Sequence, residues 1–253
     1  MRTPEPVARY DEPFTYLAQY RHAVALGTGD PADLPGASGG SRTFVFSVGR
    51  CGSTLLTRVA EGAGLATLSE PDALVALAVD GCPPEGDRLY APLLDANIGA
   101  GGLDPAARTL VKLRAQHSTP RHLARIGRAV PEADFVFVFR EPRAWARSMV
   151  GHFGLTVERL ETLYGGAVQA YATALATDTE TAILRYEDMA DGPAATARAL
   201  GLDSAAVSLP MESSQSGTRL AERPTLDADG ARTVDAFMER WPAIAREHAF
   251  LQY

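Results

Sequence analysis

The stretch 49–54, with the sequence GRCGST, holds the residue types best suited to chemistry on an anion. It follows an apolar, β-rich run, 43–48, and precedes a helical pattern over 53–63. Small residues let the backbone curl tightly, and a helix N-terminus behind them adds a partial positive charge. Ser53 and Thr54 can donate hydroxyls, and Arg50 adds a charged fork of donors. The stretch predicts a phosphate-binding loop; the alternative is an ordinary tight turn between strand and helix.

A second pair of polar residues follows another apolar run, 134–139. Arg140 stands at the end of this run, and Ser148 lies eight positions later in a helical pattern over 142–153. A guanidinium and a hydroxyl can hold one phosphate dianion together. The alternative is that Arg140 forms a surface ion pair and that Ser148 is an ordinary helix-face residue. Arg143 and Arg147 are predicted to lie on a solvated helix face.

In this order and at these positions, the two motifs resemble those of the PAPS-dependent sulfotransferases, including bacterial members. Their 5′-phosphosulfate loop is typically written Pro-(Arg/Lys)-Ser-Gly-Thr-(Thr/Ser). The resemblance implies that the donor's 5′ end is held by Arg50, Cys51, Gly52, Ser53 and Thr54. The sequence departs from the pattern at Gly49, Cys51 and Ser53, but all three residues are small, so we expect the loop geometry to survive.

The resemblance extends over roughly residues 43–220. It implies that Arg140 and Ser148 bind the donor's 3′-phosphate. Arg219 lies where the family places a flexible segment over the nucleotide, although a plain loop is the alternative there. The string RYED at 185–188 resembles one that follows a late strand in many members. We interpret that string as structural, a strand end whose acidic residues favour the start of the next helix.

Sulfuryl transfer also needs a base for the acceptor and cations for the transferring group. Glu70 is our first choice for the base, because a family subset that includes many bacterial enzymes carries a catalytic Glu in this region. Its alternative is a carboxylate at a helix start. His117 is the rival base, although it matches the family's catalytic His imperfectly and a surface position is its alternative. Lys112 and Arg50 are the candidate cations, with Arg114 as a further possibility. No partners can be identified from the sequence for His22, His122, His152 and His248.

The pattern of elements predicts the fold that must position these residues. Apolar runs recur at 43–48, 65–68, 109–113, 134–139 and 181–184, and helical patterns cover 53–63, 121–129, 142–153 and 157–176. This alternation predicts an α/β three-layer sandwich of the P-loop nucleotide-binding type, with a central parallel sheet of about five strands flanked by helices. Ligands of such sheets gather beyond the carboxyl ends of the strands.

We expect residues 1–253 to form a single domain. Residues 1–41 would supply an N-terminal helix, at 13–26, and a loop, residues 43–220 the core, and residues 221–253 a C-terminal helix. The segments 72–101 and 151–166 are the expected walls of an acceptor pocket. Their apolar members are Leu74, Leu77, Tyr90, Leu93, Phe153 and Tyr164.

Composition limits the remaining choices. The net charge of −7 over 253 residues argues against non-specific nucleic-acid binding. No stretch is apolar for long enough to span a membrane, no signal peptide opens the chain, and two cysteines make no disulfide framework. We therefore expect a cytoplasmic protein. No residues stand at metal-ligand spacing, so no metal site is expected.

The function predicted from the sequence is transfer of a sulfuryl group from 3′-phosphoadenosine 5′-phosphosulfate (PAPS) to a hydroxyl or amine of a small-molecule acceptor. Two alternatives stay open. One is a phosphotransferase that uses ATP and Mg²⁺, for which Asp188 is the only tempting Mg²⁺ ligand. The other is a nucleotide-binding protein without catalytic activity. The sequence does not indicate the acceptor or the oligomeric state.

Overall fold

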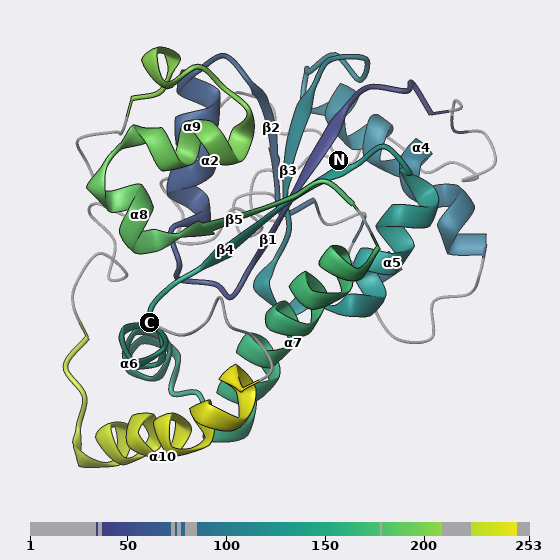
Figure 1. Cartoon of the computed structure of the whole chain (residues 1–253). Coiled ribbons are helices and arrows are strands. Elements are labelled where there is room, and N and C mark those ends of the chain that lie inside the picture. The colour runs from purple at the N-terminus through teal and green to yellow at the C-terminus, as the bar shows by residue number, and fades with distance from the viewer. Residues whose placement is uncertain are drawn as a thin grey trace.

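A five-stranded parallel sheet forms the centre of the protein (Figure 1). The structure is a computed structural model, and it describes residues 34, 37–71, 74, 77–78, 85–177, 179–208 and 224–246. The strand order is β2-β3-β1-β4-β5. The strands are β1 (Arg42–Ser47), β2 (Ala66–Ser69), β3 (Thr109–Lys112), β4 (Asp134–Phe139) and β5 (Thr181–Arg185). All five strands lie where the sequence predicts them, within two residues.

The middle strands are apolar on both faces because helices cover both faces of the sheet. Every residue of β1 is buried, as are five of the six in β4. The larger described helices are α2 (Ser53–Gly62), α4 (Glu85–Ala100), α5 (Pro120–Ala129), α6 (Pro142–Phe153), α7 (Val157–Ala176), α9 (Pro193–Leu200) and α10 (Ala228–Ala245). Helix α8 (Tyr186–Asp191) and the 3-10 turns η2 (Ala115–His117) and η3 (Ser204–Ala206) are short.

Helices α2, α8 and α9 lie on one side of the sheet and α4, α5 and α7 on the other, which confirms the predicted three-layer α/β architecture (Figure 1). Helices α6 and α10 pack against each other, and α10 also packs on α7. Because β1 and β4 are neighbours, the turn after β1 and the start of α6 meet at the same edge of the sheet.

Side chains start several helices where the sequence predicts them. The Thr119 hydroxyl accepts from the His122 amide ahead of α5, and Pro120 occupies the first position of that helix. The Glu141 carboxylate accepts from two amides of the first turn of α6, which ends at Gly154 in the left-handed conformation. Helix α6 therefore has fixed ends, and it carries Ser148 at its buried face.

Helix α4 was not predicted from the sequence, from which 72–101 was expected only to form a pocket wall. Pro92 and two glycines obscure its helical pattern, but Leu94 and Ile98 are buried and hold it on the sheet. Tyr90 and Tyr164 are fully buried, so their placement in an acceptor wall is wrong and both belong to the core. The expected helix at 13–26 lies outside the described residues.

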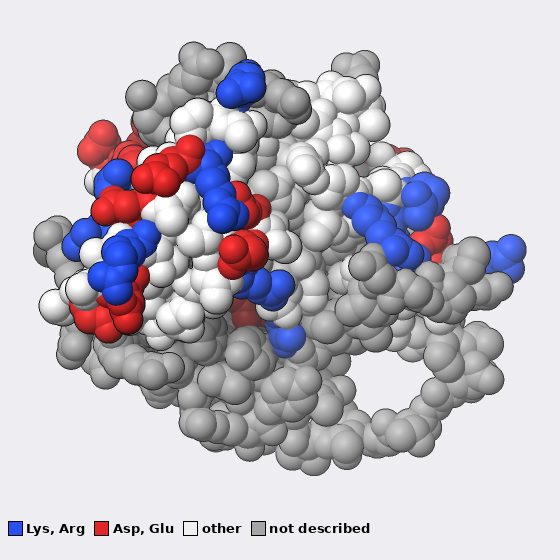
Figure 2. Space-filling view, turned by 90° about the horizontal axis from the view of Figure 1, so that it is seen from below, with Lys and Arg blue, Asp and Glu red and all other residues white. Residues whose placement is uncertain are grey.

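The side seen from below carries interspersed acidic and basic side chains (Figure 2). Arg143 forms an exposed ion pair with Asp235, and Arg240 pairs with Glu161. Arg147 is exposed as well. The prediction that Arg143 and Arg147 lie on a solvated helix face is thus confirmed. Among the described helices, none has the length and apolar character needed to cross a bilayer.

Candidate functional site

The loop between β1 and α2 is wound by left-handed backbone conformations. Gly49, Arg50 and Gly52 have φ values of 77°, 49° and 83°. Arg50 is one of two described non-glycine residues with positive φ, a conformation that costs a side-chain-bearing residue free energy. The N-cap residue of α2 is Gly52, which has no side chain with which to cap the helix. A helix N-terminus that begins in this way is suited to an anion.

Gly52 is needed for space as well as for its backbone angle. A Cβ placed there would lie 2.4 Å from Cε of Met189 and 2.7 Å from Cδ2 of Tyr186. Both neighbours belong to α8, the helix at the end of β5. The loop is therefore packed directly against the RYED string of the sequence.

We expect Gly52→Ala to destabilise the protein by about 2 kcal/mol, since it combines a steric overlap with a φ that alanine rarely adopts. Urea unfolding of the variant measures this loss. Gly62→Ala in the same helix is the control, because a Cβ at Gly62 meets nothing within 4 Å. Equal stabilities of the two variants would contradict the packing described.

The Arg50 side chain is held by two residues of α6. Its Nε donates to Oγ of Ser148 at 3.1 Å, and its Nη2 lies 3.0 Å from Nε2 of His152. Burial, and then the charge of Arg140, lowers the pKa of Arg50 from its usual value. The loop arginine and the serine of the second motif are thus in direct contact.

Arg140 lies beside the same loop. Its Nη1 donates to the backbone carbonyl of Arg50 at 3.1 Å, and its guanidinium lies 4.7 Å from the centre of the Tyr186 ring. The Arg140 Nε is buried and has no hydrogen-bond partner among the described residues. The hydroxyl of Tyr164 fixes the backbone here by donating to the Arg140 carbonyl at 2.7 Å. Two mutually repelling guanidiniums, one with an unused buried donor, favour binding of an anion.

The remaining loop residues have distinct environments. Ser53 is buried at the first position of α2, and Thr54 follows it half-buried. Cys51 is a free, fully buried thiol, and burial raises its pKa. The indole of Trp145 donates to the carbonyls of Val48 and Gly49, at 3.1 and 2.9 Å. The start of the loop is therefore anchored to α6 through its carbonyls.

Glu70 and Lys112 form a buried ion pair at the carboxyl ends of β2 and β3. Nζ of Lys112 donates to Oε1 of Glu70, and the Glu70 amide donates to the Lys112 carbonyl at 2.8 Å. Glu70 is the other non-glycine residue with positive φ, at 54°. Strained backbone of this kind is frequent at functional sites. Because the Lys112 ammonium makes this pair, it does not snorkel to the surface.

His117 is buried, with 8% of its surface exposed, so the alternative of a surface position is wrong. It lies in η2, directly after β3. Burial, and then the charge of Arg114, lowers its pKa to about 4, while the charge of Glu70 acts in the opposite direction. His117 is thus a neutral imidazole at neutral pH within the electrostatic reach of Glu70.

A second histidine fixes the turn that carries His117. The His122 Nδ1 lies 3.1 Å from the His117 carbonyl, and its Nε2 lies 2.9 Å from the Tyr90 hydroxyl. Since a carbonyl only accepts, Nδ1 carries the proton and the Tyr90 hydroxyl donates to Nε2. His122 therefore has partners that the sequence does not reveal.

Burial lowers the pKa of His122 to about 4 from an ordinary value of 6.5. Below pH 6.5 His122 takes up a proton in the unfolded chain but stays neutral in the folded protein, so the free energy of unfolding falls as the pH drops toward 4. Through His122 alone we expect the free energy of unfolding to fall by about 2 kcal/mol between pH 7 and 5. Urea unfolding at both values measures this. A His122→Asn variant should show a smaller difference, and equal pH dependence would count against the assignment.

The loop after β1 and the residues around Glu70, Lys112 and His117 meet at one edge of the sheet. The Lys112 charge acts on the Cys51 thiol, and a Cβ at Gly49 would lie 3.1 Å from that of Ala115 in η2. Ser118, just after η2, exchanges two 2.9 Å hydrogen bonds with the backbone of Ser47. The loop after β1, the Glu70–Lys112 pair and the turn bearing His117 therefore lie next to one another at this edge of the sheet.

Two neighbours of the candidate site residues were not identified from the sequence. His152 lies one helical turn after Ser148 and contacts Arg50, and Tyr186 contacts both the loop and Arg140. The spacing of four between Ser148 and His152 was the available signal. The RYED string does start a helix, as predicted, but it is also part of the site. Arg219, His22 and His248 lie outside the described residues.

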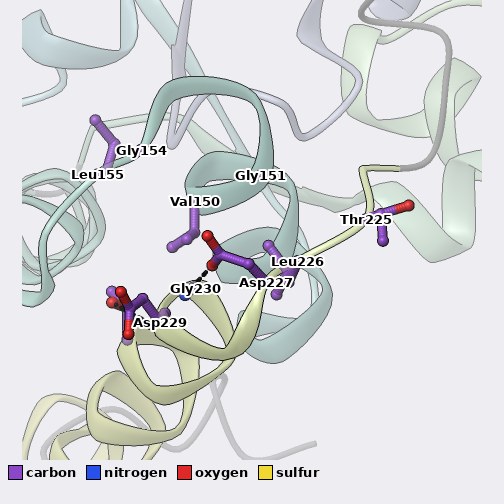
Figure 3. A pocket seen from close by; sticks show the side chains of 10 residues that line it. Val150, Gly151, Gly154, Leu155, Thr225, Leu226, Asp227, Asp229 and Gly230 are labelled. Carbon is purple, nitrogen blue, oxygen red and sulfur yellow. Dashed lines mark hydrogen bonds between the residues drawn. The ribbon is translucent and has the colours of Figure 1, made fainter.

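A pocket of about 360 Å³ lies between the end of α6 and the start of α10 (Figure 3). Val150, Gly151 and Gly154 line it on one side, and Asp227 and Asp229 on the other. Asp227 accepts from the Gly230 amide and thereby caps α10. Gly151 and Gly154 fall within the segment 151–166 that was expected as an acceptor wall, but none of the described candidate phosphate-binding or catalytic residues lines this pocket.

The sequence and the structure were compared with those of known proteins. No protein-family model matches the sequence, and no curated protein does either. Among solved structures, a sulfotransferase domain from the Synechococcus PCC 7002 olefin synthase matches with a TM-score of 0.50 at 16% identity, over 84% of this chain and 98% of that domain. The fold is that of a sulfotransferase domain. The sulfotransferase STF1 from Mycobacterium tuberculosis H37Rv gives a TM-score of 0.49 at 14% identity, over 84% of this chain and 78% of that one.

Proposed function

We propose that the protein is a PAPS-dependent sulfotransferase that acts on a hydroxyl or amine of a small molecule. The observation that carries the proposal is the meeting of Arg50, Arg140 and Ser148 at a glycine-wound loop on a sulfotransferase fold. Two sequence motifs some ninety residues apart, each interpreted as a phosphate site, touch each other in space. An ordinary tight turn has no need of two clustered guanidiniums.

The donor, when bound, supplies an activated sulfuryl group on a 5′-phosphate. The loop amides, Ser53 and Thr54 are proposed to hold its 5′ end. Arg140 and Ser148 are proposed to hold its 3′-phosphate, and the buried Nε of Arg140 is a donor that such a group would satisfy. Cys51 is fully buried, so it is proposed to contribute its backbone and not its thiol.

Glu70 is proposed as the base that takes the acceptor's proton. Lys112 orients its carboxylate and can supply positive charge to the transferring group. His117 is the alternative base, since burial keeps its imidazole neutral and able to accept a proton. The two residues lie within electrostatic reach of each other, so their variants must be compared side by side.

The fold and the site argue against the phosphotransferase alternative. Ser53 stands where the ATP-binding loop of P-loop kinases has a lysine. Asp188 is exposed on α8, in the turn that follows β5 and not within the strand. A nucleotide-binding protein without catalytic activity would not require the buried Glu70–Lys112 pair, whose desolvation is costly.

Calorimetric titration with 3′-phosphoadenosine 5′-phosphate (PAP), the spent donor, tests the proposal against ATP with Mg²⁺. We expect micromolar binding of PAP and none of ATP. The reverse result would assign the loop to a phosphotransferase and reject the role of Arg140 and Ser148. Binding of PAP without turnover of PAPS for any hydroxyl or amine acceptor would support the non-catalytic alternative.

A further inference from the structure

We infer that His152 is a positioning residue of the donor site, and that its neutral imidazole aims the Arg50 guanidinium without cancelling its charge. The inference rests on the proposed function and adds to it a residue that the family motifs do not include. It starts from one contact, the 3.0 Å approach of Arg50 Nη2 to His152 Nε2.

The chemistry of the two groups fixes the direction of this hydrogen bond. A guanidinium has five donors and no acceptor, so Nε2 of His152 must be the acceptor. The proton of the imidazole then sits on Nδ1, and the ring is neutral. His152 in this state adds no charge to a site that already contains Arg50 and Arg140.

Ser148 completes the arrangement. Its Oγ accepts from Nε of Arg50 at 3.1 Å, so two neutral acceptors one helical turn apart engage two nitrogens of the same guanidinium. A carboxylate in either position would hold Arg50 more strongly, but it would neutralise the charge that an anionic donor requires. Neutral acceptors restrict the side chain and leave its charge for the ligand.

Helix α6 is firmly placed for this task. Its Ser148 and His152 face the loop, while Val150 and Gly151 meet the segment before α10 (Figure 3). A Cβ at Gly151 would overlap Cβ of Pro224, so the backbone of α6 passes close to the segment before α10 at this glycine. The helix that carries the acceptors for Arg50 therefore also contacts this segment through another of its faces.

The experiment compares His152→Gln, His152→Glu and His152→Leu for calorimetric binding of PAP and for thermal stability. Glutamine keeps a neutral acceptor, glutamate keeps an acceptor but adds a negative charge, and leucine removes the acceptor. We expect His152→Gln to bind within threefold of the wild-type affinity. His152→Leu should bind PAP about tenfold more weakly than the wild type. His152→Glu should bind PAP at least as weakly as His152→Leu, although the ion pair of the new carboxylate with Arg50 preserves the melting temperature. Arg147→Gln, on the exposed face of α6, is the control and should bind like the wild type.

Wild-type affinity in His152→Leu, or in His152→Glu, would overturn the inference. In turnover assays the same variants should raise the KM for PAPS and leave the KM for the acceptor unchanged, whereas a merely structural role would lower only stability. If the wild type itself fails to bind PAP, the proposed function fails. Nitrogen NMR of the imidazole then tests His152 without a donor. An unprotonated Nε2 that shifts on Arg50→Gln supports the contact, and a protonated Nε2 overturns it.

Discussion

Glu70→Gln is expected to lower kcat for sulfuryl transfer at least a hundredfold and to leave PAP affinity within threefold of the wild type. The amide keeps the shape of the side chain and its contact with Lys112, but it cannot take a proton from the acceptor. Steady-state turnover of PAPS, beside calorimetric binding of PAP, separates the two effects. The exposed Glu132→Gln is the matched control and should show wild-type values in both.

His117→Asn must be measured in parallel with Glu70→Gln. If Glu70 is the base, the His117 variant retains most of its turnover, because the imidazole only borders the ion pair. Wild-type turnover in Glu70→Gln together with a large loss in His117→Asn would transfer the role of base to His117. The folded state of both variants is checked by circular dichroism, because an uncompensated Lys112 ammonium is unfavourable in a buried position.

Arg140→Ala is expected to weaken PAP binding by about 2–3 kcal/mol, which is the size of a lost charge-assisted contact with a phosphate. The dissociation constant should therefore rise by roughly 30- to 150-fold in calorimetry. Arg140→Lys keeps the charge but loses the planar fork, so an intermediate loss is expected.

The control for Arg140 is Arg143→Ala, which removes the same kind of side chain from an exposed position on α6. The Arg143→Ala substitution should change the affinity for PAP by less than twofold. Because Arg140 also holds the Arg50 carbonyl and stacks on Tyr186, its variant will lose some thermal stability. Unchanged PAP affinity in Arg140→Ala would remove the main support for the nucleotide assignment.

The layered fold could be predicted because each of its strands is recognisable from its own stretch of sequence. β1 and β4 are continuous apolar runs, which is what a strand buried on both faces requires. Helix α4 could not be predicted in the same way, since Gly86, Pro92 and Gly99 contradict local helix preference and only packing on the sheet overrides it. Its position depends on distant residues that a local pattern does not contain.

The candidate site could be predicted only where a local sequence pattern contains its residues. Arg50, Arg140 and Ser148 belong to two motifs with a recognisable spacing, so their proximity could be expected. The partners of His122 could not, because a single histidine on a helix carries no signal of what it faces, and for His152 only its spacing of four from Ser148 gave a signal. The burial of His117 likewise depends on how η2 packs against the loop after β1, which no pattern in the chain specifies.

The order of the strands has a consequence for how the chain reaches its folded state. β1 comes first among the described strands but lies at the centre of the sheet, and it pairs only with β3 and β4. During synthesis the phenylalanines of β1 can be covered by both neighbouring strands, β3 and β4, only after the chain has been made as far as Phe139. Closing such long loops is slow, so we expect refolding to be slow and the early chain to depend on protection from aggregation. The loop after β1 can take its final shape only then, because both strands that flank it must already be in place.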